Sequence, residues 1–245
     1  MSMPPSLQLV IPCYNEARRL KPDVFLQLTA TERDIGLVFV DDGSRDGTAA
    51  ILADIAARGV PRVTVLTLEE NAGKATAVQR GILEALTLGP EFVGFWDADL
   101  STPLTALPAF MEIFRTRPAV EIVMGARVKL LGRDIRRSLV RHYCGRAFAT
   151  AASFALGIAV YDTQCGAKIF RATDAVRQVF STPFQSRWIF DVELLARYLA
   201  AAGNDQSELR ICELPLDSWT AVAGSKLTVR HAVRAVWDLV LIARR

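Results

Sequence analysis

Two aspartates that follow an apolar run are the first residues whose spacing suggests chemistry. Asp97 and Asp99 come directly after the apolar segment 92–96, and residues i and i+2 of an extended segment point to the same side. Converging carboxylates repel each other and lose hydration at the end of a buried strand. A divalent cation removes this repulsion, and a cation held by one or two carboxylates is suited to bind a diphosphate. The spacing therefore predicts a metal site, with an aspartate that caps the following turn as the alternative.

Two further segments carry groups that suit a nucleotide. Asp41 and Asp42 lie in a glycine-containing turn, where an exposed carboxylate can accept hydrogen bonds from a base or a ribose. Gly73 and Lys74 stand at the start of a predicted helix, where free N–H groups and a cation favour phosphate. The sequence contains neither GxxxxGKS/T nor GxGxxG, which argues against a Walker loop and against a nicotinamide or flavin enzyme.

These side chains must be positioned by the alternating elements of the first half of the chain. Apolar runs predict strands over 7–12, 35–44, 62–68, 91–99 and 121–127, and helical periodicity predicts helices over 51–59 and 74–86. Such alternation is typical of an α/β fold, with a mostly parallel sheet flanked by helices. The polar clusters follow the strands, so they should meet in a ligand-binding crevice at the carboxyl ends of the sheet.

The second half is more helical, with helices predicted over 138–157, 188–203 and 228–245. No internal repeat or interdomain linker is visible. We expect one domain over residues 1–225, followed by a basic amphipathic helix over 226–245 that is part of the same domain or lies against a membrane. In that helix Arg230 and Arg234 share one stripe, and Trp237 faces largely elsewhere. A helix packed on the core is the alternative.

Composition limits the class of protein. The chain has 245 residues, of which 51% are hydrophobic, and a formal charge of +3, which allows one sizeable core and is too small to indicate nucleic-acid binding. The four cysteines are far apart without a CxxC pair, as expected for reduced thiols in the cytoplasm. The longest uncharged run, 147–161, is shorter than the roughly 20 residues of a spanning helix. We therefore expect a cytoplasmic protein that is at most peripheral to a membrane.

The combined motifs resemble a known family. The segments "VIPCYNE", "FVDDGSRDGT", "NAGKATAVQRG" and "DADL" resemble the family 2 glycosyltransferases of the GT-A fold. The segments "YDTQCGAKIFR" and "RWIFDVELL", with Trp219 and the "GSK" at 224–226, look like the dolichyl-phosphate glucosyltransferases. Polyprenyl-phosphate mannosyl- and glucosyltransferases share the first half more than the second. The resemblance covers essentially the whole chain.

This resemblance implies a donor site in the first half. A nucleotide sugar, most simply UDP-glucose, would be held through its nucleotide and its diphosphate, and Mg²⁺ or Mn²⁺ would bind to Asp97 and Asp99. Ser101 is a possible further metal contact, although mannosyl relatives often carry glutamine there. The residues expected to bind the donor are Pro12, Tyr14, Glu16, Asp41, Asp42, Lys74 and Asp97.

The basic residues of the second half could hold the phosphate of a polyprenyl acceptor. Arg137 and Arg141 are spaced i, i+4, Arg127 ends the fifth strand, and Lys226 lies in "GSK". Arginine and lysine can position such a phosphate, and we also expect Arg127 and Lys226 to stabilise the leaving diphosphate. A solvated basic face is the alternative.

Three acidic or amide side chains of the second half are also candidates. Asp191, near a helix start, is a candidate general base, although a phosphate acceptor is already ionised and Asp191 would then orient other groups. Asp162 and Gln164 either shape a sugar pocket or bridge neighbouring groups.

The sequence thus predicts an inverting, metal-dependent enzyme that moves glucose from UDP-glucose to a polyprenyl or dolichyl phosphate, peripheral to the cytoplasmic face of a membrane. A GDP-mannose enzyme, a non-catalytic nucleotide-sugar-binding protein at a membrane surface and a nucleotidyltransferase are the alternatives. The last of these lacks its glycine-rich, basic N-terminal loop here.

Overall fold

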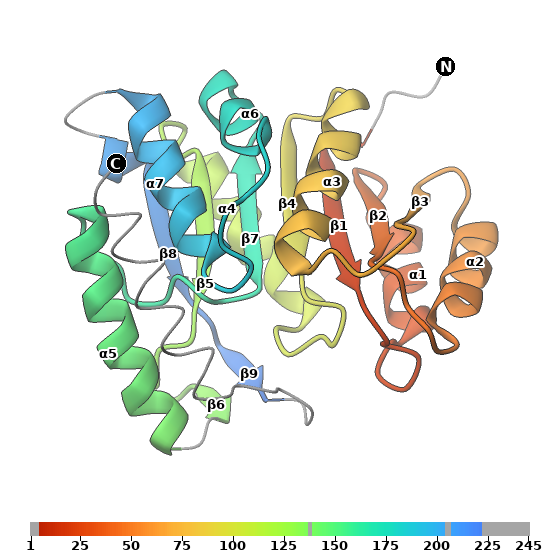
Figure 1. Cartoon of the computed structure of the whole chain (residues 1–245), viewed down its shortest axis with the longest axis horizontal. Coiled ribbons are helices and arrows are strands. Elements are labelled where there is room, and N and C mark those ends of the chain that lie inside the picture. Colours follow the sequence, from red (N-terminus) through yellow and green to blue (C-terminus); the bar gives the residue numbers. More distant parts are fainter. Residues whose placement is uncertain (1–4, 137–138, 204–206, 222–245) are drawn as a thin grey trace. The chain divides into compact units, whose positions relative to one another are not determined.

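A computed structural model describes residues 5–136, 139–203 and 207–221 of the chain. These residues fall into two structural units, the first with residues 5–100 and 169–183 and the second with residues 101–168 and 184–221. Figure 1 labels the helices and strands of both units. The single domain over 1–225 stays a prediction, and the predicted C-terminal helix lies outside the described residues.

The first unit alternates strands and helices, as the sequence predicts. In chain order its elements are β1 (Leu7–Cys13), α1 (Pro22–Thr31), β2 (Ile35–Asp41), α2 (Thr48–Gly59), β3 (Val63–Thr67), α3 (Lys74–Thr87), β4 (Phe92–Trp96), most of β7 (Ala167–Arg171) and α6 (Asp174–Phe180). The strand order is β3-β2-β1-β4-β7, and β1 is parallel to β2 and β4 while β2 is parallel to β3. The predicted parallel α/β architecture of this half is confirmed.

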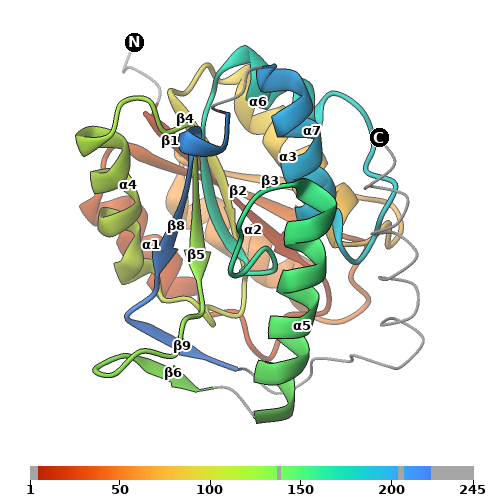
Figure 2. The ribbon, with the colours of Figure 1, turned by 90° about the vertical axis from the view of Figure 1, so that its left-hand side faces the viewer.

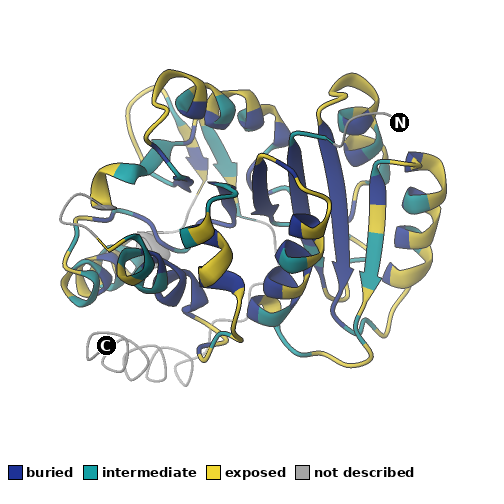
Figure 3. Cartoon of the chain, turned by 90° about the horizontal axis from the view of Figure 1, so that it is seen from above, coloured by how far each residue is buried: buried dark blue, intermediate teal, exposed yellow. Residues whose placement is uncertain are grey.

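Helices cover both faces of this part of the sheet. The strands β2 and β4 are buried along their whole length (Figure 3). Helix α3 packs over Val10 and Val40, and Phe25 of α1 contacts Phe39 edge to face with 5.2 Å between the ring centroids. Phe39 and Val40 are neighbours in β2, so their side chains point to opposite faces. Helices α1 and α3 therefore lie on opposite sides of the sheet, which explains why its strands are apolar almost throughout.

Strand pairing brings the polar clusters to one edge. Cys13 pairs with Asp41 between β1 and β2, and Val10 pairs with Phe95 between β1 and β4. Because these strands are parallel, the segments that follow them leave the sheet at the same edge. The structure thus places the loops after β1, β2 and β4 where the sequence predicts a crevice.

The second unit contains the remaining elements. These are the 3₁₀ turn η1 (Leu104–Ala106), α4 (Leu107–Thr116), β5 (Ile122–Ala126), β6 (Asp134–Arg136), α5 (Leu139–Leu156), α7 (Phe190–Ala202), η2 (Ser207–Arg210), β8 (Ile211–Pro215) and β9 (Ser218–Thr220). Strands β5 and β8 are parallel, and so are β6 and β9, which form a separate pair. The predicted elements at 121–127, 138–157 and 188–203 are confirmed as β5, α5 and α7.

The long helix α5 packs against α7 in this unit (Figure 2). Ala152 of α5 is buried together with Ile189 and Val192, and Phe148 and Leu156 of α5 pack against this cluster. The alanine-rich face of α5 permits this close approach. This packing buries one side of α5, whereas the side chains of Tyr143 and Phe154 on the same helix are exposed.

Among the described residues, seven α-helices and strands were not predicted, namely α1, α4, α6 and the strands β6 to β9, and neither were the 3₁₀ turns η1 and η2. Strands β6 and β9 have three residues each, too few to establish a period of two. Strand β8 has the sequence ICELP and is only partly buried throughout. The glutamate in its centre interrupts the apolar run. Helix α6 has seven residues, which is shorter than the window over which helical periodicity is measurable.

All four cysteines are free thiols, as expected from their spacing. Burial raises the pKa of the Cys13 and Cys165 thiols, which keeps them protonated and unreactive. Among the described residues there is no helix that combines the length and the apolar character needed to cross a membrane.

Replacing Gly81 by alanine tests the close packing of α3 on the sheet. A Cβ at this position would clash with the methyl groups of Val10 and Val40. Overpacking of this kind costs about 1–3 kcal/mol, which exceeds the roughly 1 kcal/mol that alanine gains over glycine inside a helix. We expect Gly81→Ala to lower the free energy of unfolding, measured by denaturant titration. Gly47→Ala is the matched control because its Cβ would meet only Ala17, at 3.6 Å, and an equal loss in both variants would contradict the packing argument.

Candidate active site

Asp97 and Asp99 lie where the sequence places them, directly after the buried strand β4. Both are partly exposed, whereas Ala98 between them is 3% exposed. Residues 97–100 form a turn closed by a hydrogen bond of 3.1 Å from the N–H of Leu100 to the carbonyl of Asp97, so the predicted extended conformation of this segment is wrong. Leu100 has φ +54°, a left-handed conformation that is unfavourable for leucine and is typical of functional loops.

A third carboxylate, Glu16, lies near this pair because β1 and β4 are neighbours. Arg19 holds Glu16 with two hydrogen bonds, of 2.8 Å from Nε and 2.5 Å from Nη2. Burial raises the pKa of the Glu16 carboxyl, Arg19 opposes this rise, and the charges of Asp99 and Asp97 add to it, so that the pKa lies above its usual value. The ends of β1 and β4 thus form a region of concentrated negative charge.

Lys74 supplies positive charge to the same region. Its Nζ lies 2.5 Å from Oδ1 of Asp97 and 5.9 Å from the ring centroid of Phe95. Lys74 is the first residue of α3, and Gly73 before it has φ +94°, which an L-residue rarely adopts. The predicted combination of a helix N-terminus and a cation is therefore present beside Asp97.

The two acids at the end of β2, Asp41 and Asp42, accept hydrogen bonds from backbone N–H groups. Asp42 accepts hydrogen bonds from the N–H groups of Ala72 and Gly73, at 2.8 and 2.9 Å, and from the side chain of Asn71 at 3.0 Å. Asp41 accepts from the N–H of Ser44 at 3.0 Å. Both acids are 2% exposed, so the expectation of an exposed carboxylate is wrong. The reason is that Asp42 satisfies the polar backbone of the loop that leads into α3. A role of either acid in nucleotide binding stays a prediction.

The loop after β1 is held by the turn before α2. Thr48 Oγ1 accepts from the N–H of Glu16 at 2.8 Å and donates to Asp46 at 2.5 Å, while Asp46 also accepts from the N–H of Ala17 at 3.2 Å. This network fixes the backbone beside Tyr14, whose side chain is 44% exposed. We call this part of the molecule the first-unit site, defined by Pro12, Tyr14, Glu16, Asp41, Asp42, Lys74, Asp97 and Asp99.

The carboxylates after β4 fit a divalent cation that keeps open coordination positions. In the described ranges no group of three or more histidine, cysteine or acidic side chains is arranged to enclose a metal. Asp97 and Asp99 would instead supply two oxygens and leave the rest to a ligand, as is usual for Mg²⁺ with phosphates. Ser101 is 8% exposed and accepts a hydrogen bond from the N–H of Thr220 through its carbonyl, at 3.1 Å. Its predicted contact with the metal stays a prediction.

Arg127 lies directly after β5, where it forms a paired network in the second unit. Its guanidinium binds Asp162 through Nε at 2.6 Å and Nη2 at 2.7 Å, and stacks on Trp219 with 5.2 Å to the ring centroid. Glu213 accepts from the N–H groups of Tyr161 and Asp162 at 2.8 and 2.7 Å. Asp162 therefore bridges groups, as one of the two predicted roles proposes, and Arg127 is held rigidly by it.

Asp191, the candidate general base, is 5% exposed in the first turn of α7. Its Oδ1 lies 2.5 Å from Nζ of Lys168, which also donates to the carbonyl of Cys165 at 2.7 Å. Lys168 is fully buried, so the pair is shielded from solvent. This arrangement favours a role for Asp191 in fixing the second unit, and its part in catalysis stays a prediction.

Sequence reasoning missed several partners of these residues. Arg19 stands three residues after Glu16, so helical or turn-like spacing was a usable signal. Lys168 lies in an apolar run, which is a weak signal of a buried cation. Glu213 gave no local signal, because its partners are about 50 residues away in sequence. Of the expected phosphate ligands, Arg137 and Lys226 lie outside the described residues, and the side chain of Arg141 is not described.

Comparison with known proteins identifies the family. The pattern of the family described as Glycosyl transferase family 2 matches residues 8–177, which is more than half of the chain. The chain belongs to glycosyl transferase family 2. The predicted resemblance is confirmed, and the chain is a glycosyltransferase.

Relatives within the family carry a more specific name. A dolichyl-phosphate beta-glucosyltransferase of Trichomonas vaginalis is 30% identical over 96% of this chain and 69% of its own length. The dolichyl-phosphate beta-glucosyltransferase of Drosophila melanogaster is 34% identical over 91% of this chain and 70% of its own length. Among solved structures, glucosyl-3-phosphoglycerate synthase of Mycobacterium tuberculosis with Mn²⁺, UDP-glucose and phosphoglyceric acid matches 97% of this chain and 78% of its own, with a TM-score of 0.67 and 18% identity. The predicted GT-A fold is confirmed.

The Asp42→Asn variant tests whether the hydrogen bonds of this buried acid stabilise the loop before α3. The amide keeps the size of the side chain but places a donor against the N–H groups that Asp42 binds. Loss of hydrogen bonds to a buried charged group costs about 1.5–3 kcal/mol, and we expect a fall of this size in the free energy of unfolding. The control is Asp54→Asn, an exposed partner of Arg58, where we expect less than about 1 kcal/mol. Equal effects in denaturant titrations would refute the assignment.

Proposed function

We propose that this glycosyltransferase transfers glucose from UDP-glucose to the phosphate of a polyprenyl or dolichyl lipid, with inversion at the anomeric carbon. The observation that carries the proposal is the similarity, over nearly the whole chain, to proteins named dolichyl-phosphate beta-glucosyltransferase. A beta product from a nucleotide sugar with an alpha linkage requires inversion. The transfer would need a donor site and a group that binds an anionic acceptor.

The first-unit site has the features that the donor requires. The exposed ring of Tyr14 offers a flat surface for a base. Lys74 and the N-terminus of α3 supply a cation and N–H groups for the diphosphate. Mg²⁺ or Mn²⁺ held by Asp97 and Asp99, with Ser101 as a further contact, would stabilise the charge that develops on the leaving UDP. The Mycobacterium tuberculosis synthase, crystallised with Mn²⁺ and UDP-glucose, supports this choice of donor and metal.

The chemistry needs little from a general base. An oxygen of the acceptor phosphate forms the new bond to C1 of glucose while the bond from C1 to the UDP oxygen breaks. The phosphate monoester is already ionised near neutral pH, so no proton must be removed before attack. We therefore give Asp191, which is paired with buried Lys168, an orienting role. The cations proposed for the acceptor phosphate and for the leaving group are Arg127, Arg137, Arg141 and Lys226.

A lipid acceptor implies contact with the membrane that holds it, which we propose is peripheral and on the cytoplasmic face. The second unit exposes large apolar side chains that could make this contact. Leu130 and Leu131, in the segment between β5 and β6, are 48% and 104% exposed, and Phe154 of α5 is 85% exposed. Lys129 precedes the two leucines, and such a cation favours an anionic lipid surface.

A transfer assay tests the proposed function and separates it from a mannosyl enzyme. Purified protein is mixed with Mn²⁺, a polyprenyl phosphate and radiolabelled UDP-glucose or GDP-mannose, and label in the lipid phase is counted. We expect transfer from UDP-glucose, loss of transfer with EDTA, and little transfer from GDP-mannose. If only GDP-mannose gives label in the lipid phase, the donor is GDP-mannose and not UDP-glucose. If neither sugar gives label, the proposed lipid-phosphate acceptor is wrong.

Asp99→Asn tests the proposed metal site. The amide keeps the shape but removes one negative charge from the cation, so we expect transfer to fall at least about a hundredfold, equivalent to roughly 2.7 kcal/mol of transition-state stabilisation. Titration calorimetry should show loss of Mn²⁺-dependent UDP binding, while the melting temperature stays near that of the wild type. Asp23→Asn, whose side chain is 89% exposed, is the control. Turnover and UDP binding unchanged in Asp99→Asn would exclude a metal role for this residue.

A further inference from the structure

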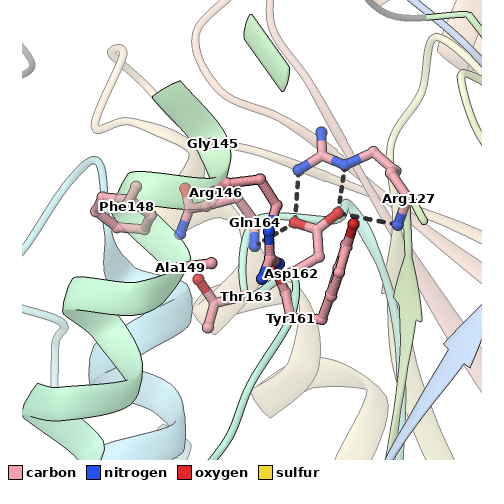
Figure 4. Close-up of a pocket in the computed structure, with 9 residues that line it drawn as sticks. All are labelled: Arg127, Gly145, Arg146, Phe148, Ala149, Tyr161, Asp162, Thr163 and Gln164. Carbon is pink, nitrogen blue, oxygen red and sulfur yellow. Dashed lines mark hydrogen bonds and ion pairs between the residues drawn. The ribbon is translucent and has the colours of Figure 1, made fainter. Parts of the chain in front are cut away.

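A pocket in the second unit carries polar groups that the proposed roles do not use. It lies among the helix α5, the loop before β7 and the end of β5, and holds about 370 Å³ of empty space that includes open solvent (Figure 4). Its lining residues are Arg127, Gly145, Arg146, Phe148, Ala149, Tyr161, Asp162, Thr163 and Gln164.

Two adjacent residues present buried polar atoms to this pocket without a protein partner. The hydroxyl of Thr163, a residue that is 1% exposed, has no hydrogen-bond partner among the described residues, and the same holds for the side-chain nitrogen of Gln164. A buried polar group without a partner destabilises a protein by about 1–3 kcal/mol, so most such groups in proteins are satisfied. Two in succession beside a pocket indicate a ligand.

Arg146 supplies positive charge at the same place. Its guanidinium stacks on the ring of Tyr161, 3.8 Å from the centroid, and Nη1 donates to the carbonyl of Tyr161 at 3.2 Å. Within the described ranges no carboxylate forms an ion pair with Arg146, in contrast to Arg127, which is paired with Asp162. A half-buried guanidinium fixed in this way has donors left for a ligand.

The charge of the lining favours one kind of ligand. The side-chain oxygen of Gln164 and the hydroxyls of Tyr161 and Thr163 can accept hydrogen bonds, but Arg146 and the amide nitrogen of Gln164 only donate, and Arg146 carries a positive charge. The carboxylate in the lining, Asp162, already accepts from Arg127 and from the N–H of Gln164 at 3.1 Å. A sugar hydroxyl needs acceptors as well as donors, whereas phosphate oxygens only accept and carry charge. The pocket therefore suits a phosphate group better than a sugar.

We propose that Arg146, Thr163 and Gln164 form a subsite for a phosphate group, and that its ligand is the phosphate of the lipid acceptor. The identity of the ligand as an acceptor rests on the proposed function, but the subsite itself rests on the geometry of the second unit. This subsite adds Arg146 and two neutral polar residues to the phosphate ligands predicted from the sequence. It also gives the unpartnered hydroxyl and amide their partners when the acceptor is bound.

Thr163→Val in the full chain tests the subsite directly, with inorganic phosphate as the probe. Valine has the shape of threonine but no hydroxyl. We expect phosphate binding, followed by titration calorimetry, to weaken about tenfold because a hydrogen bond to a charged group is lost. The melting temperature without phosphate should stay equal or rise, since the hydroxyl has no partner in the protein. Thr150→Val is the matched control, because Thr150 on the same helix as Arg146 is exposed and bonds only the carbonyl of Arg146.

Gln164→Glu is the second variant, because it places a carboxylate where the proposed anion binds. We expect it to abolish measurable phosphate binding. If wild type, Thr163→Val and Gln164→Glu bind phosphate equally, or if wild type does not bind it, the subsite is refuted.

Kinetics with farnesyl phosphate as a soluble acceptor distinguish a lipid phosphate from free phosphate. We expect Thr163→Val to raise the KM for farnesyl phosphate about tenfold and to leave the KM for UDP-glucose unchanged. A raised KM for UDP-glucose alone, or normal farnesyl phosphate kinetics beside weakened phosphate binding, would overturn the assignment to the acceptor. If wild type binds phosphate through these residues but transfers no glucose, the subsite stands and the proposed function fails.

Discussion

Repulsion among carboxylates at the ends of β1 and β4 is the constraint around which the first unit is organised. Pairing of these strands brings Glu16 near Asp97 and Asp99, and burial, together with the charges of Asp99 and Asp97, raises the pKa of Glu16. Arg19 and Lys74 offset part of the charge by pairing with Glu16 and Asp97. Under the proposed function, a bound cation would compete with Lys74 for Asp97. The lysine would then be released toward the diphosphate that arrives with the cation, and its ion pair with Asp97 would be the resting arrangement of the donor site.

Loops of both units are held by a repeated arrangement, in which a buried or partly buried carboxylate accepts hydrogen bonds from two successive backbone N–H groups. Each bond is charge-assisted, so it is stronger than a bond between neutral groups. The arrangement lets a loop without regular secondary structure satisfy its polar backbone while it turns side chains toward a ligand. The three acids and the residues they hold are Asp42 with 72–73, Glu213 with 161–162 and Glu193 with 185–186.

The contrast between local and distant signals explains what the sequence could predict. The apolar runs and the polar residues directly after them identified β1 to β4 and the position of Asp97 and Asp99, because both signals are contained in short segments. Burial of Asp42 was missed because its partners are about 30 residues away and bind through backbone atoms, which leave no trace in residue type. The pairing of Asp191 with Lys168 was missed because the two residues are 23 apart in sequence and meet only when β7 and α7 come together.

Each of the two candidate sites contains local features that are unfavourable for stability. Asn15 and Leu100 have a positive φ of 54°, and both belong to loops of the first-unit site. In the second unit, Thr163 and Gln164 keep polar atoms buried without protein partners. Each feature reduces stability by an amount of order 1 kcal/mol or more, and substitutions that remove it without changing the fold are available to evolution. Departures from local rules concentrate at functional sites. The strain beside Asp99 and the unpartnered groups beside Arg146 are therefore best explained by ligands that bind to each unit.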